Sequence, residues 1–217
     1  MTSAMAVVRR PAGRLLRYGE APLPTARGTF RAVVFREAGG AEHLALAMGE
    51  LAGAAVPVRV HSECLTSEVL GSLKCDCRDQ LDRALDLIAA AGRGVLVYLR
   101  QEGRGIGLGN KIRAYALQAR GADTYEANRL LGFGDDLRRY DVAAEILRQL
   151  GVRSVDLITN NPEKTSGLAA AGVRVRRRLR VPSPVNPHNR SYLETKRRRT
   201  GHLIELEAAA GGEPVTR

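Results

Sequence analysis

Apolar and polar residues follow a β-strand pattern in the first third of the chain. Segments 29–36, 43–48 and 56–61 either alternate or run apolar over strand lengths, with glycine-containing turns between them. This pattern predicts an antiparallel sheet whose third strand leads directly into residues 59–80. Residues 1–28 are rich in Pro, Gly and Arg, so we expect a partly ordered lead-in with at most one edge strand.

In the middle of the chain, the spacing of apolar residues becomes that of a helix. From Asp79 to Ala91, apolar residues recur at helical spacing and charged residues occupy the other face, which predicts an amphipathic helix. The apolar run Gly94–Leu99 predicts a buried strand. A glycine-rich loop at 100–111 and a helix through Gln118 follow it.

Helices and strands alternate in the remaining part. Helices are predicted at 123–131, at 141–150 and from Pro162 onward, and strands at 154–159 and 173–176. The predicted fold class is therefore α+β, a mixed α/β arrangement. Mainly antiparallel strands come first, and an alternating strand–helix half comes second.

The composition indicates the size of the hydrophobic core and the compartment in which we expect the protein. A chain of 217 residues with 44% hydrophobic content can form a normal globular core. Its apolar runs are too short to cross a bilayer, and its first residues show no secretory apolar segment. An odd number of cysteines without a paired framework indicates a reducing compartment. We therefore expect a soluble, cytoplasmic protein that does not contact membranes.

The net charge of +11 is concentrated near the end of the chain. Residues 174–199 hold ten Lys or Arg and one acid, while the remainder holds 24 bases and 22 acids. An aromatic content of 4%, without tryptophan, argues against base stacking, so nucleic acid is not an expected partner and the cluster is interpreted as a solvated basic face. Only four bases are lysines, which makes them more informative than the arginines: Lys74, Lys111, Lys164 and Lys196.

All three cysteines lie within residues 59–80, as Cys64, Cys75 and Cys77. Thiolates are soft ligands that suit zinc, and three protein ligands leave a fourth tetrahedral position for water, as in catalytic sites. The spacing does not match a zinc ribbon, which argues against an ordinary structural site. Structural zinc completed by a histidine and inert or redox-active cysteines remain as alternatives.

The loop at 100–111 joins a strand to a helix N-terminus, which is a favourable arrangement for binding an anion. It matches neither the phosphate-binding loop of NTPases nor the dinucleotide-binding glycine motif, because Asn110 and Leu108 stand where the glycines are required. A flexible turn is the alternative. The charged side chains of Arg100, Glu102 and Lys111 favour a functional loop.

Several motifs occur together in one order and resemble the GTP cyclohydrolase II family over about residues 28–204. They are Arg59–Cys64, Cys75–Cys77, Arg100–Leu108, Asn110–Gln118, Glu126–Asn128 and Leu157–Pro162. The resemblance implies that the imidazole ring of GTP is opened with release of formate and pyrophosphate, the first step of riboflavin biosynthesis. It also implies one catalytic domain at 29–204, a homodimer and a monofunctional chain, with 205–217 expected to be a disordered tail.

The resemblance also implies roles for particular residues. One zinc ion per subunit would be held by Cys64, Cys75 and Cys77 with a water molecule. GTP, or its triphosphate bound to Mg²⁺, would contact Arg59, Val60, His61, Ser62, Glu63, Gln80, Glu102, Gly103, Arg104, Thr124, Thr159 and Lys164. The proton acceptor would be Asp136, the nucleophile Arg138 and the catalytic tyrosine Tyr115.

Elementary chemistry refines some of these roles. Guanine needs an acceptor for its N1–H and 2-amino groups, and Glu102 is the expected one. A guanidinium stays protonated and is a poor nucleophile, so Arg138 is better explained as a clamp on the transition state. Tyr115 could instead lie on an apolar helix face, and Asp136 could cap a helix. The family commonly has Asp where this chain has Arg139, which adds positive charge beside Arg138.

Two further functions remain open at this level. A paralogue could stop at the formylated, ring-opened product or serve a specialised purine-derived pathway, although the presence of Tyr115 argues against an early stop. A zinc-stabilised, non-catalytic protein could bind nucleotides or RNA through the basic segment 174–199.

Overall fold

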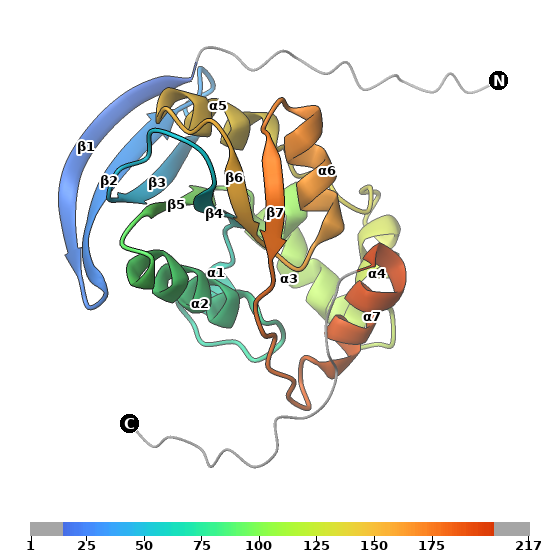
Figure 1. Ribbon diagram of the computed structural model, residues 1–217. Helices are drawn as coiled ribbons and strands as arrows, with labels where there is room; N and C mark the ends of the chain where they lie inside the picture. Colours follow the sequence, from blue (N-terminus) through green and yellow to red (C-terminus); the bar gives the residue numbers. More distant parts are fainter. Residues whose placement is uncertain (1–14, 202–217) are drawn as a thin grey trace.

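The computed structural model describes residues 15–201, which form one seven-stranded sheet with helices on both faces (Figure 1). The strand order is β1-β2-β3-β5-β4-β6-β7. The strands are β1 Leu16–Thr25, β2 Gly28–Arg36, β3 Glu42–Met48, β4 Val56–Ser62, β5 Gly94–Leu99, β6 Val155–Ile158 and β7 Val175–Leu179. The helices are α1 Leu65–Glu68, α2 Cys77–Ala90, α3 Gly107–Gln118, α4 Thr124–Leu130, α5 Asp141–Gln149, α6 Pro162–Ala170 and α7 Arg190–Thr200, with a 3₁₀ turn η1 at Glu102–Gly105.

The predicted mixed α/β class is confirmed. Strands β1, β2 and β3 pair antiparallel, and β3 pairs antiparallel with β5. The prediction that the strand at 56–61 continues the antiparallel sheet is wrong, because β4 pairs in parallel with both β5 and β6. The helix α2 connects β4 to β5, and such a strand–helix–strand crossover returns the chain in the same direction. As a result, β5 lies between β3 and β4.

The central strands are buried on both faces, which explains their continuous apolar runs. On one face, α5 and α6 pack through Ile146 and Leu168 against a cluster that includes Val58 and Val97. On the other face, α2 packs through Ala84 and Ile88 against Phe30 and Leu96. Figure 1 shows this layering, with α2 separated by the sheet from α5 and α6.

The first and last elements of the described chain can be compared with the sequence predictions. Strand β1 lies within the segment expected to hold at most one edge strand, and residues 1–14 lie outside the described residues. Helix α7 was not predicted, because its sequence is mostly charged and only a few of its side chains are buried. The predicted tail at 205–217 also lies outside the described residues. None of the helices at 15–201 is long and apolar enough to span a bilayer.

The parallel strands determine where a site can form. The carboxyl ends of β4, β5 and β6 lead into Glu63–Cys64, Arg100–Gly105 and Thr159–Asn161, respectively. In open α/β sheets, ligands bind in the crevice beyond these strand ends, where connections diverge. All three of these segments contain residues that the motifs had singled out.

Candidate active site

A pocket lies at the carboxyl ends of β4, β5 and β6 and extends between α3, α4 and α7. Its lining includes most of the residues predicted for the site. These are Arg59, His61, Ser62, Glu63, Cys64, Cys75, Cys77, Gln80, Glu102, Gly103, Arg104, Tyr115, Thr124, Arg138, Thr159 and Lys164. The fold thus brings together segments that are more than 100 residues apart in the chain. One example is the hydrogen bond that Lys164 Nζ donates to the carbonyl of Val60 on β4, at 2.8 Å.

The three cysteine thiols form a compact group, in which the ligand atoms all lie within 4.8 Å of one another. The sulfur atoms of Cys64 and Cys75 are 3.6 Å apart. Tetrahedral zinc with bonds of about 2.3 Å places two thiolates about 3.8 Å apart, so this donor set fits zinc. Cys64 and Cys75 are buried and Cys77 is half-buried, and the segment between them includes the short helix α1.

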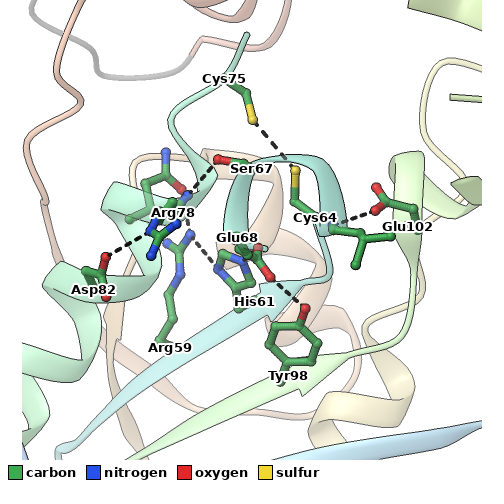
Figure 2. A network of polar contacts seen from close by, with 12 residues as sticks. Arg59, His61, Cys64, Ser67, Glu68, Cys75, Arg78, Asp82, Tyr98 and Glu102 are labelled. Carbon is green, nitrogen blue, oxygen red and sulfur yellow. Dashed lines mark hydrogen bonds and ion pairs between the residues drawn. The ribbon is translucent and has the colours of Figure 1, made fainter. Parts of the chain in front are cut away.

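Lys111 and Glu102 connect the cysteines to the glycine-rich loop. The ammonium group of Lys111 lies 3.2 Å from Cys64 Sγ and 2.7 Å from Glu102 Oε1. Glu102 also accepts hydrogen bonds from the backbone N–H groups of Leu65 and Gly103, each at 2.7 Å. Figure 2 shows Glu102 beside the chain that follows Cys64. Both carboxylate oxygens of Glu102 therefore already hold protein donors.

The loop itself forms the 3₁₀ turn η1 at Glu102–Gly105. Gly103 and Arg104 both have left-handed backbone angles, with φ of 62° and 59°. This conformation is unusual for an arginine. It places the Arg104 guanidinium 4.5 Å above the Tyr125 ring, with the buried Nη1 lacking a hydrogen-bond partner among the described residues.

A buried polar network lies next to the cysteine cluster (Figure 2). Arg59 donates to Gln80 Oε1 at 2.6 Å and to the carbonyl of Ile158 at 3.0 Å. His61 Nε2 lies 2.6 Å from Glu68, which also accepts from Tyr98 Oη at 2.6 Å (Figure 2). Burial lowers the pKa of His61 to about 4 despite the Glu68 carboxylate, so this imidazole is neutral near pH 7.

Cations dominate the part of the pocket near α6. Arg138 is held by Asp136, whose carboxylate accepts from both the Arg138 backbone and its guanidinium. Burial lowers the pKa of Lys164 well below its usual value, and the positive charges of Arg59 and Arg138 act in the same direction. Such mutual repulsion among buried cations favours the binding of an anion between them.

Two predicted residues do not line the pocket, namely Val60 and Asp136. Val60 is buried in the sheet, where its carbonyl accepts from Lys164. Asp136 holds Arg138 and does not cap a helix, since α5 begins later and has no side-chain cap. Arg139 points to Glu37 and Asp141, at 3.0 and 2.7 Å, and does not join the pocket. Tyr115 on α3 lines the pocket.

Several lining residues were not assigned a role from sequence. All four lysines of the chain line this one pocket. The scarcity of lysine among the bases was a sequence signal for both Lys74 and Lys196, although neither was assigned a role. Tyr125 and Asn128 on α4 and Tyr192 on α7 also line it; Asn128 belongs to one of the motifs of the resemblance, but none of the three was assigned a role.

A cluster of thiols that could hold a metal ion shares a pocket with buried basic side chains at the carboxyl ends of parallel strands, which is the arrangement of an α/β protein that can take a metal ion and an anion together. The comparison with family models narrows this class. The model described as GTP cyclohydrolase II matches residues 17–180, and this chain belongs to that family.

Relatives with recorded names agree with this assignment. The GTP cyclohydrolase-2 of Aeromonas hydrophila subsp. hydrophila is 53% identical over 185 residues, which cover 84% of this chain and 94% of that protein. The riboflavin biosynthesis protein RibBA of Bacillus subtilis is 53% identical over 187 residues, which cover 85% of this chain and 47% of that protein. The chain thus spans about half the length of the RibBA relatives. A solved structure titled RibBX, a two domain 3,4-dihydroxy-2-butanone 4-phosphate synthase from A. baumannii, matches with a TM-score of 0.45 and 22% identity, over 79% of this chain and 41% of that one.

Proposed function

We propose that this protein opens the imidazole ring of GTP and releases formate and pyrophosphate, as the entry step of riboflavin biosynthesis. The observation that carries the proposal is the single pocket in which three thiols lie beside a group of buried cations. The thiols fit a zinc ion, and the cations fit a triphosphate. Together they match a substrate that must lose a purine carbon at one end and a pyrophosphate at the other.

Zinc would be held by Cys64, Cys75 and Cys77, where it would supply a Lewis acid that activates water for attack on the purine carbon. Lys111 lies against Cys64 and offsets part of the negative charge of three thiolates. The phenol of Tyr115 lines the same pocket and would exchange a proton with the opening ring.

The triphosphate would lie along the cationic side of the pocket. The buried Nη1 of Arg104 has no hydrogen-bond partner within residues 15–201, and it would donate to a phosphate oxygen. Arg138, oriented by Asp136, would stabilise the charge that develops as pyrophosphate leaves. Lys164 would be stabilised in its charged form by the same phosphates, and Mg²⁺ would accompany them.

Guanine would be positioned by the residues between the cysteines and the glycine-rich loop. A carboxylate offers about four acceptor positions, and Glu102 already uses three of them for Leu65, Gly103 and Lys111. Glu102 therefore has one acceptor position left for guanine. Gln80 has its amide committed to Arg59 and Asp76, so its role would be to hold Arg59 in place.

The decisive experiment incubates zinc-loaded protein with GTP and Mg²⁺ and measures formate, pyrophosphate and the pyrimidine product separately. We expect all three in equal amounts. Pyrophosphate without formate would contradict the full reaction and favour a paralogue that stops at the formylated product. GTP binding without any product would favour a non-catalytic nucleotide-binding protein. The variant Cys75→Ser should lose both zinc and formate release, and retention of formate release would exclude a catalytic zinc at this cluster.

A homodimer belongs to the same proposal. Exposed apolar side chains occur between Cys64 and Cys75, including Leu70 at 71% and Leu73 at 57%, and on α3, where Ile112 is 49% exposed. Lys74 contacts Tyr115 on α3, so this loop and this helix are neighbours. Such apolar groups favour burial against a second copy. Sedimentation should give twice the chain mass, and the variant Leu70→Glu should reduce it to the monomer.

A further inference from the structure

Helix α7 contributes two side chains to the pocket, Tyr192 and Lys196. The helix is anchored by Leu193, which is fully buried, and by Arg199, which donates to Asp123 at the start of α4 at 2.6 Å. Its exposed face carries the remaining arginines. A segment that composition alone presents as a solvated basic face therefore also has an inner face that reaches the site.

The contact that matters most joins Lys196 to Asp76. The ammonium group lies 2.9 Å from Asp76 Oδ1, although the two residues are 120 positions apart in the chain. Asp76 is completely buried and Lys196 is 8% exposed. A pair this deeply buried depends on good geometry, because each charge loses its hydration when water is excluded.

Asp76 occupies an unusual position. It lies between Cys75 and Cys77, and it is the residue that precedes the first turn of α2. An aspartate there commonly caps the helix, yet this side chain makes no capping hydrogen bond. Its carboxylate instead binds Lys196 and the side-chain amide of Gln80. The orientation of Asp76 is therefore determined jointly by Lys196 on α7 and by Gln80 in the first turn of α2, and not by a capping contact with the backbone.

The same network continues to the opposite side of the pocket. Gln80 Oε1 accepts from Arg59 at 2.6 Å, and Arg59 donates to the carbonyl of Ile158 at the end of β6. A continuous buried path thus runs from α7 through the cysteine segment to β4 and β6. Each member has its orientation fixed by the next, and ligand-orienting contacts of this kind influence metal affinity strongly.

We propose that Lys196 is a positioning residue for this site. Lys196 holds the Cys75–Cys77 segment in place through Asp76, and it holds Arg59 in place through Asp76 and Gln80. Helix α7 is then a clamp that must be docked for tight metal and nucleotide binding. The metal part rests on the cysteine geometry and on the contact between Lys196 and Asp76, and only the nucleotide part rests on the proposed function.

The test compares Lys196→Met with Arg197→Met, a matched change on the exposed face of the same helix. Zinc transfer to a chelator is followed first. We expect it to be at least about 10-fold faster in Lys196→Met and unchanged in Arg197→Met. A non-hydrolysable GTP analogue should bind about 10-fold more weakly to Lys196→Met, and KM for GTP should rise by more than kcat falls. Lys196→Arg, which keeps the charge, should recover part of both properties.

Equal zinc-transfer rates and equal analogue affinities in folded Lys196→Met and Arg197→Met would overturn the proposal. If Lys196→Met does not fold, Lys196→Gln is the second variant. It retains a donor for Asp76 but loses the positive charge, so zinc transfer and analogue binding should change in the same direction by a smaller amount. Wild-type values of both in Lys196→Gln would also overturn the proposal. Faster zinc transfer in a protein that never turns over GTP would support the clamp while contradicting the proposed function. The two failures are therefore distinguishable.

Discussion

Arg138 shows how single residues acquire their role from one neighbour. The Asp136 carboxylate accepts its Nε at 2.9 Å, and the same contact raises the pKa of the guanidinium against the opposing effect of burial. The side chain is therefore cationic and fixed in direction. Both properties suit an electrostatic clamp on a leaving pyrophosphate, and neither suits a nucleophile.

Replacing Arg138 tests this interpretation at the scale of one charge. Arg138→Lys keeps the charge and should retain a measurable fraction of pyrophosphate release, whereas Arg138→Gln should lower kcat by roughly 10²–10³-fold. Pyrophosphate release in single turnovers is the appropriate measurement. A guanylyl adduct isolated on Arg138 would contradict the clamp and establish covalent catalysis.

At the scale of an element, the 3₁₀ turn η1 and helix α4 shape the pocket wall. The turn needs a left-handed backbone at Gly103, directly after Glu102, which binds Lys111. Helix α4 begins with a complete capping box, in which Asp123 accepts from the N–H groups of Tyr125 and Glu126. The left-handed turn and the capping box each orient side chains that line the site, so the local backbone conformation influences the geometry of the pocket.

Substitution of Gly103 should disturb the site more than substitution of Gly107. Both glycines have a positive φ, so an alanine at either position costs about 1–2 kcal/mol of backbone strain. An added Cβ at Gly103 would lie 3.1 Å from Ile106 and from Lys111, whereas Gly107 has open space. We expect similar losses of unfolding free energy in the two variants but faster zinc loss only in Gly103→Ala. Equal zinc loss would show that the close contact is unimportant.

The cap of α4 makes a separate prediction. Asp123→Ala should reduce the free energy of unfolding by about 1 kcal/mol, because two N–H groups lose their acceptor. Asp123→Asn retains a good cap and removes only the charge that faces Arg199. Chemical denaturation of the two variants separates the capping contribution from the ion pair. Equal stability of Asp123→Ala and Asp123→Asn would mean that the cap contributes nothing.

At the scale of the whole molecule, charge pairing holds the last strand on the sheet. Asp156 on β6 is buried and binds Arg176 at 2.8 Å and Arg177 at 2.8 Å on β7. The hydrogen bonds from Arg176, followed by those from Arg177, hold the pKa of Asp156 below its usual value. Two of the ten bases in the segment 174–199 thus share one carboxylate where the segment meets the sheet.

This pairing predicts a dependence of stability on pH. Because the folded pKa of Asp156 is below the unfolded value of about 3.9, its stabilisation is present above that value and is lost as the pH falls through the folded pKa. Asp156→Asn should cost about 1–2 kcal/mol near neutral pH, and its difference from wild type should shrink in strong acid. Thermal unfolding across this range is the measurement, with Asp86→Asn as an exposed control. A difference that does not change with pH would contradict the assignment.

The sequence by itself determined the local elements and the chemical identity of the site. Helical spacing located α2 and α5, the run Gly94–Leu99 located β5, and the cysteine cluster indicated zinc. These features depend on periodicity and on residue type, which are visible in a short stretch of chain. The ordered motifs also identified the family and most of the side chains that line the pocket.

Only the tertiary structure decided the direction of β4 and the role of α7. Parallel pairing of β4 depends on the crossover through α2, which places β5 between β3 and β4. The alternation of side chains along a strand is the same in parallel and antiparallel pairs, so it could not predict the direction of β4. The burial of Lys196 against Asp76 joins residues 120 positions apart. Neither residue carries a local signal of its partner, because a contact of that range exists only once the sheet and its helices have packed.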